Sequence, residues 1–367
     1  MTAHARAWGW VAHLTSGGTT PWADWTEAGP AAQAGVLPGA QHLELLRRLN
    51  LAGPTPTPLV RRVLASGAPG RGQQELGLVG VAETSRYGAP PVDPADLPDD
   101  ELVRLASGVL ADLVVSAPEP APPRNRRPRL FRHEYRLAGN RLTADALRAQ
   151  LIRDGRPPGG TRPTVVMLLG DLGAHLADTW AARVRRAFAP PWDDWIHELA
   201  ERPQLPPRLD PVARARAWAD RVSASRVHLA LAPAAAGEAL GVRGLTGPTR
   251  LSHAALDAAG HTKGVLRVLV NDVEREQRLR GVLLPWLEAG DTPTLPAPVV
   301  PRRHRGWLEH EARRIRAGLA DAGYSVHGGE LDQLLPAEPV RTAGPTDREV
   351  LTVMLRTLRV ATMEGQA

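Results

Sequence analysis

Short apolar runs alternate with amphipathic stretches through the second part of the chain. The most apolar run, PTVVMLL at 163–169, is short enough and apolar enough to form a strand buried on both faces. Further strands are expected at 130–137 and 226–232. Apolar residues at helical spacing fill the ranges 142–155, 172–186, 210–222, 253–287 and 304–323. Strands separated by helices of this length need crossover connections, so we expect an α/β fold with a parallel sheet flanked by helices.

The first part of the chain carries helical patterns without comparable strand signals. Leucines recur every three residues in 38–50 and form one apolar stripe, made by Leu43, Leu46 and Leu49. Two more helices are expected at 6–14 and toward the end of 91–115. A smaller, mainly helical segment is therefore expected before the α/β domain.

A Pro-rich and then Arg-rich stretch, SAPEPAPPRNRRP at 116–128, separates these two parts. Its composition is typical of a semi-extended linker. We therefore expect a mainly helical accessory segment, this linker, an α/β domain and a C-terminal helix or tail. Their expected ranges are 1–115, 116–128, 129–340 and 341–367.

Positive charge is densest around that linker. The cluster consists of Arg124, Arg126, Arg127, Arg129, Arg132 and Arg136. Residues 1–120 hold 8 Arg against 12 Asp and Glu, a net charge of −4, and the remainder holds 37 basic against 27 acidic residues, a net charge of +10. This sign difference favours docking of the cluster on the acidic first segment over an anion site or a nucleic-acid partner.

Cysteine is absent from the sequence, which excludes disulfides, thiolate nucleophiles and cysteine metal sites. The N-terminus has no apolar core of signal-peptide length, and no uncharged apolar run is long enough to span a bilayer. We therefore expect a cytoplasmic protein without a membrane partner.

Two tryptophan triplets share one spacing, with Pro before the middle Trp and Asp before the last. They are Trp10, Trp22 and Trp25, and Trp180, Trp192 and Trp195. The pattern indicates a duplicated helix–loop–helix unit, with Pro21 and Pro191 each starting a helix. Core packing explains these tryptophans best, and a stacking surface for a sugar or base is the alternative.

Four stretches within 128–336 carry a family resemblance: the strand–turn–helix at 130–155, VVMLLGDLGAHLADTW, PPWDDW followed by RAWADRVSASRVHLALAP, and AGYSVHGGELDQLLP. In these stretches, over a little more than half of its length, the chain resembles the sulfotransferase-like P-loop proteins common in high-GC actinobacteria. The resemblance implies a P-loop fold and 3′-phosphoadenosine 5′-phosphosulfate as the donor.

The resemblance also implies a donor-binding loop at YRLAGNRLTADAL (135–147). The family's loop reads roughly Pro-Lys-Thr-Gly-Thr-Thr, and its backbone N–H groups and Lys hold the phosphosulfate. Here Gly139 matches the family glycine, and Thr143 is expected to cap the following helix. The Lys has no counterpart, although Arg136 or Arg141 could supply charge.

The family's site for the 3′-phosphate is a strand-end Arg followed eight residues later by Ser, and these positions hold Gly170 and Asp178 here. The first change removes a cation, and the second puts a carboxylate beside a dianion. That repulsion costs roughly 4 kcal/mol per charge pair at an effective dielectric constant near 20. We therefore expect a pseudoenzyme that needs no cofactor and acts as an interaction or regulatory partner of another protein.

Two alternatives remain for the function. One is an active sulfotransferase or related group transferase whose non-standard anion site uses Arg136 and Arg141, and the other is a nucleic-acid-binding protein using the Arg124–Arg136 cluster.

His133, followed by Glu134, and His175, four residues after Asp171, are candidate acid–base residues. A strand-edge pair and a helix N-cap at Asp171 are the simpler interpretations. The IHELAE stretch at 196–201 lacks the second His of a zinc-protease helix, so no metal site is expected.

Overall fold

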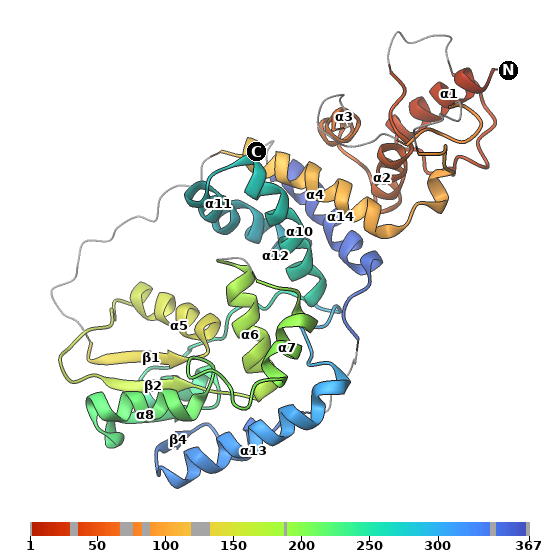
Figure 1. Ribbon diagram of the computed structural model, residues 1–367. Coiled ribbons are helices and arrows are strands. Elements are labelled where there is room, and N and C mark those ends of the chain that lie inside the picture. Colours follow the sequence, from red (N-terminus) through yellow and green to blue (C-terminus); the bar gives the residue numbers. More distant parts are fainter. Residues whose placement is uncertain are drawn as a thin grey trace. The chain divides into compact units, whose positions relative to one another are not determined.

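The computed structural model describes residues 2–29, 36–66, 76–82, 89–118, 133–186, 189–337 and 343–364 (Figure 1). The chain forms two compact units. Unit 1 combines Met1–Pro120, Ala254–Pro293 and Pro345–Ala367, and unit 2 combines Ala121–His253 and Thr294–Gly344. The units differ from the expected division, because 254–293, assigned to the α/β domain, and the C-terminal stretch both belong with the N-terminal segment.

Unit 2 contains a four-stranded parallel sheet in the order β1-β2-β3-β4. The strands are β1 (Tyr135–Gly139), β2 (Thr164–Leu168), β3 (Val227–Ala230) and β4 (Ser325–His327). In β2, Val166 and Leu168 join an apolar cluster on one face, while Val165 and Met167 alternate with them and are fully buried on the other. Both faces of the central strand are therefore covered, as its apolar sequence predicts. The chain is thus α/β with a parallel sheet.

Helices connect these strands. They are α5 (Arg141–Arg153), α6 (Leu172–Val184), α7 (Trp192–Ala200), α8 (Pro211–Val222), α9 (Pro233–Leu240) and α13 (Arg305–Asp321). Short 3₁₀ turns lie at Ala224–Arg226, Arg302–His304 and Leu331–Leu334. Residues of α5 and α9, including Leu147 and Ala236, pack on the face of Val166 and Leu168. Helix α8 contacts β2 and β3 and packs against α13.

Unit 1 is mainly helical, as expected for the N-terminal segment. Its helices are α1 (Ala3–Thr15), α2 (Ala40–Leu51), α3 (Thr57–Ala65), α4 (Asp99–Ser116), α10 (His253–Leu269), α11 (Asp272–Arg278), the π-helical turn η3 (Leu279–Leu283), α12 (Leu284–Gly290) and α14 (Asp347–Glu364). A 3₁₀ turn covers Pro94–Asp96, and Leu78 pairs with Val92 in an isolated bridge. Helix α4 packs along α14, two helices far apart in the sequence (Figure 1).

Most elements agree with the sequence pattern to within a few residues, with three kinds of error. The strand expected at 130–137 is β1, which begins at Tyr135 and continues to Gly139. The pattern missed α3 and α9. Pro191 is the N-cap of α7, but Pro21 begins only a turn.

The Arg-rich linker prediction rests mostly on residues outside the described ranges, which are Arg124, Arg126, Arg127, Arg129 and Arg132.

The two tryptophan triplets make matching contacts, each within its own unit. The indole N–H of Trp10 donates to the carbonyl of Thr20 at 2.9 Å, and that of Trp180 donates to the carbonyl of Pro190 at 2.9 Å. The ring centroids of the first and second tryptophans are 5.4 Å apart in unit 1 and 5.5 Å apart in unit 2. These repeated contacts support the inferred duplication.

The third tryptophan repeats as well. His13, three residues after the first Trp, stacks on Trp25 with ring centroids 4.4 Å apart, and Arg183 occupies the same place over Trp195 at 5.8 Å. Five of the six rings are at most 3% exposed, and the sixth, Trp25, is half-buried. Core packing is therefore the role of these rings, and the stacking surface considered above is wrong.

Within the described residues, no helix combines the length and the apolar content needed to cross a membrane.

Candidate functional site

The connection from β1 to α5 consists of a single residue, Asn140. Gly139 has a φ of +88°, and a Cβ there would lie 2.1 Å from the carbonyl oxygen of Leu168, so this position requires glycine. The Asn140 Oδ1 accepts a hydrogen bond from the backbone N–H of Thr143 at 3.3 Å. Asn140, and not Thr143 as predicted, therefore caps the helix. A one-residue turn lacks the run of backbone N–H groups that cradles a phosphate in a P-loop.

Asp178 on α6 is held by two partners. Arg250 donates from Nε to Oδ1 and from Nη2 to Oδ2, both at 2.8 Å, and Asn140 Nδ2 donates to Oδ2 at 2.6 Å. The side chain of Asp178 is 5% exposed, whereas that of Arg250 is 53% exposed. Asp178 is thus a buried carboxylate neutralised within the fold by a bidentate pair that has one face in solvent.

Arg214 on α8 brings a second cation to this end of the sheet. Its Nη1 donates to the carbonyl oxygen of Gly139 at 2.6 Å, and burial lowers its pKa. His175 on α6 feels both neighbouring charges. Burial, reinforced by Arg214, lowers the pKa of His175 to about 4, although Asp178 opposes the shift. The imidazole is therefore neutral at pH 7, and its Nδ1 has no hydrogen-bond partner.

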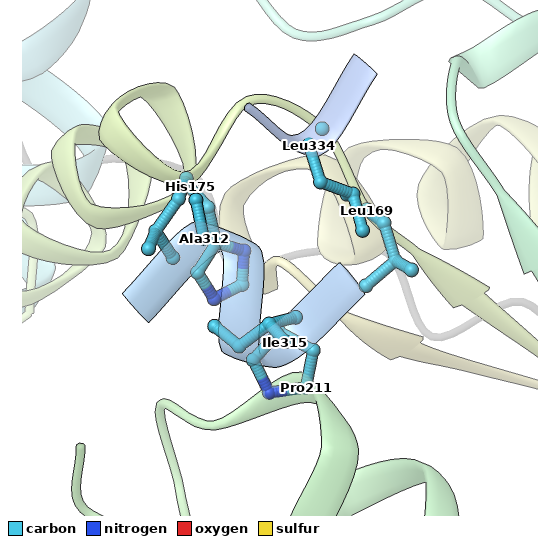
Figure 2. Close-up of a pocket in the computed structure, with 8 residues that line it drawn as sticks. Leu169, His175, Pro211, Ala312, Ile315 and Leu334 are labelled. Atoms are coloured by element: carbon cyan, nitrogen blue, oxygen red, sulfur yellow. The ribbon is translucent and has the colours of Figure 1, made fainter. Parts of the chain in front are cut away.

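His175 and Gly170 line a small apolar cavity with Leu169, Pro211, Ile315 and Leu334. Figure 2 shows the His175 imidazole lining the cavity together with Ala312 and Ile315 of α13 and Pro211 of α8. The cavity has room for about one water molecule. It is too small for a nucleotide. A Cβ at Gly170 would meet no atom within 4 Å. Lack of space for a side chain therefore does not explain why this position lacks the arginine of the family.

His133 and Arg136 lie at the amino ends of the strands, away from this cluster. His133 pairs with Pro158, and Arg136 Nη1 approaches the carbonyl oxygen of Gly159 at 3.5 Å, both in the loop that precedes β2. The carboxyl ends carry Gly139 and Gly170 instead. Because the strands are parallel, Arg136 and His133 lie at the opposite end of the sheet from Gly139 and Gly170, so the structure does not bring these predicted site residues together.

The remaining predicted residues have local roles. Arg141 is 64% exposed and lies 3.7 Å from Asp145. The Asp171 carboxylate accepts from the backbone N–H groups of Ala174 and Ala337, at 2.8 and 2.7 Å. Asp171 is therefore the helix N-cap that the sequence predicts, and both of its oxygens bind backbone N–H groups. Asp171 and His175 thus form no hydrogen-bonded acid–base pair.

Sequence reasoning missed three members of the cluster. Asn140 precedes a helix and was recognisable as an N-cap residue from its type alone. Arg214 and Arg250 carry no such signal, because they lie 36 and 72 residues after Asp178 in an arginine-rich chain. Chemically, the cluster is a hydrogen-bonded group of Asp178, Arg250 and Asn140, with Arg214 and the neutral imidazole of His175 beside it at the carboxyl ends of β1 and β2.

Among the described residues, no three His, Asp or Glu side chains gather as a metal site. No family model, no curated protein and no solved structure matches this chain.

Proposed function

We propose that the chain is a sulfotransferase-like pseudoenzyme, which does not bind the sulfate donor and acts as a non-catalytic partner of another protein. The observation that carries the proposal is the internal neutralisation of Asp178 by Arg250 and Asn140. The position where the family's serine meets the 3′-phosphate here holds a carboxylate whose charge is already paired.

A bound nucleotide would have to displace this network. Moving Arg250 onto the phosphate leaves the buried Asp178 carboxylate with only its Asn140 partner. This costs about 2 kcal/mol, less than for a fully buried pair because Arg250 is half exposed. Keeping Arg250 in place leaves the phosphate beside a carboxylate. Either route weakens binding of the nucleotide, which favours a scaffold over an enzyme.

Isothermal titration of the full chain with adenosine 3′,5′-bisphosphate at low ionic strength tests the first half of the proposal. We expect no saturable heat up to millimolar nucleotide. A micromolar dissociation constant contradicts the proposal. Sulfate transfer by the purified chain to any acceptor would contradict the non-catalytic role.

The two arginines favour a second candidate function, a transferase with a non-standard anion site. Arg214 and Arg250 lie at the carboxyl ends of the strands, where ligands of α/β proteins commonly bind. In that case the bisphosphate binds, and Arg250→Gln weakens it at least about tenfold. Arg136→Gln, at the other end of β1, is the matched control and leaves the affinity unchanged.

A further inference from the structure

A larger pocket lies in unit 1, among the ends of several helices. It has a volume of about 340 Å³. Its walls come from α3, the C-terminal ends of α4 and α14, the π-helical turn η3 and the start of α12. The volume lies in the range of pockets that hold small molecules. No part of this wall comes from unit 2.

A distorted helix forms one wall of the pocket. Pro285 follows η3, and its ring would clash with the carbonyl of Gly281 four residues earlier in a regular α-helix. Widening of the helix to a π-turn, in which the Leu284 N–H donates to the Leu279 carbonyl, relieves that clash. Gly281 and Pro285 both line the pocket. Such π-turns recur at functional sites because they reshape a helix surface.

Two side chains of opposite charge, Arg62 and Glu364, line this pocket, and each can form further hydrogen bonds to a ligand. Arg62 Nη1 donates to the Ser116 hydroxyl at 3.0 Å, and within the described residues Arg62 makes no ion pair with a carboxylate. The Glu364 carboxylate accepts from the Trp286 indole N–H at 2.7 Å. Each charged group is thus oriented by a neutral partner, and a guanidinium retains further donors.

The rest of the pocket wall is largely apolar. Leu113, Val282, Pro58 and Pro285 contribute aliphatic surface, and Trp286 adds a largely buried indole. The C-terminal end of α4 has its own partner, because Arg278 donates to the carbonyl oxygens of Val114 and Ala117. These carbonyl groups are therefore already hydrogen-bonded. The charges left for a ligand are therefore one cation and one anion.

We propose that this pocket binds a small zwitterion with an apolar body, an amino-acid-like molecule. Arg62 pairs with the carboxylate of the ligand, Glu364 accepts from its ammonium group, and the wall around Trp286 and Val282 covers its apolar part. The site is independent of the function proposed for unit 2.

Isothermal titration of the full chain with L-phenylalanine tests this site. Two analogues each lack one charge: 3-phenylpropanoate has no ammonium group, and 2-phenylethylammonium has no carboxylate. We expect saturable binding of L-phenylalanine and at least about tenfold weaker binding of either analogue. Absence of saturable binding, or an analogue that binds as tightly as L-phenylalanine, overturns the proposal.

Three variants place the ligand in the pocket. Arg62→Gln and Glu364→Gln each weaken L-phenylalanine binding at least about tenfold, because each removes a charge but keeps a donor for Ser116 or an acceptor for Trp286. Arg61→Gln, which changes an exposed arginine outside the pocket, is the matched control. Circular dichroism verifies that each variant is folded. Unchanged affinity in folded Arg62→Gln and Glu364→Gln overturns the proposal.

Discussion

Replacing His42 by Leu isolates the effect of one buried imidazole on the stability of unit 1. His42 lies on α2, is 1% exposed, and neither ring nitrogen has a hydrogen-bond partner. Burial lowers its pKa from 6.5 to about 4, with Glu101 opposing the shift and Arg104 adding to it. The folded state therefore holds this side chain neutral at pH 7.

The sign of the pH effect follows from this shift. Between pH 6.5 and pH 4, His42 is protonated in the unfolded chain but stays neutral in the folded chain. The free energy of unfolding therefore falls as the pH drops toward 4. The two pKa values correspond to a loss of about 2 kcal/mol at pH 5 relative to pH 8, and about 3 kcal/mol near pH 4. Leu at this position removes the loss. It also removes two unsatisfied polar atoms, so we expect Leu to raise stability at neutral pH by about 1 kcal/mol.

Urea unfolding followed by circular dichroism at pH 8, 6 and 5 measures these differences. His42→Leu should be less sensitive to pH than the unaltered chain by about 2 kcal/mol between pH 8 and 5. His310→Gln, which replaces an exposed histidine, is the control and should keep the original pH dependence. Equal pH dependence in His42→Leu and the unaltered chain would refute the reasoning.

Two further predictions concern unit 2. Arg250→Gln leaves the buried Asp178 carboxylate with only its amide partner, and we expect a loss of about 2 kcal/mol, less than for a fully buried pair because Arg250 is half exposed. Adding Asp178→Asn should recover more than half of the loss in a urea-unfolding cycle, and simple additivity of the two changes would contradict the ion-pair role. Gly139→Ala should destabilise unit 2 by about 2–5 kcal/mol, because its φ is positive and its Cβ would meet the Leu168 carbonyl. At Gly170 a new Cβ would meet no atom, so the free energy of unfolding of Gly170→Ala should lie within about 0.5 kcal/mol of that of the unaltered chain.

Local interactions made much of the secondary structure predictable. The apolar run of β2 predicted a strand buried on both faces, and Asp171 was predictable as an N-cap because its carboxylate binds the N–H of Ala174, three residues away. The tryptophan triplets were recognisable because their contacts join residues about ten positions apart. In each case the residues that interact are close in the sequence, so the pattern contains both partners.

The candidate site was predictable only in part. The resemblance pointed to Gly139, Gly170 and Asp178, which the structure places at the carboxyl ends of β1 and β2 and on α6. It did not reveal that Asn140 spans the whole turn from strand to helix, because the strand proved to end two residues later than its apolar pattern suggested. That shift shortened the expected loop to one residue.

By itself, the sequence determined most of the helices, the buried central strand and the tryptophan repeat, since short-range periodicity and capping act within a few turns of chain. Only the tertiary structure decided which charges meet. Arg250 reaches Asp178 across 72 residues, and three separated stretches assemble unit 1 around α4 and α14. Strand direction placed His133 and Arg136 at the amino ends of the sheet, away from Asp178. These pairings depend on how the chain returns on itself, and no local pattern of residue types encodes that path.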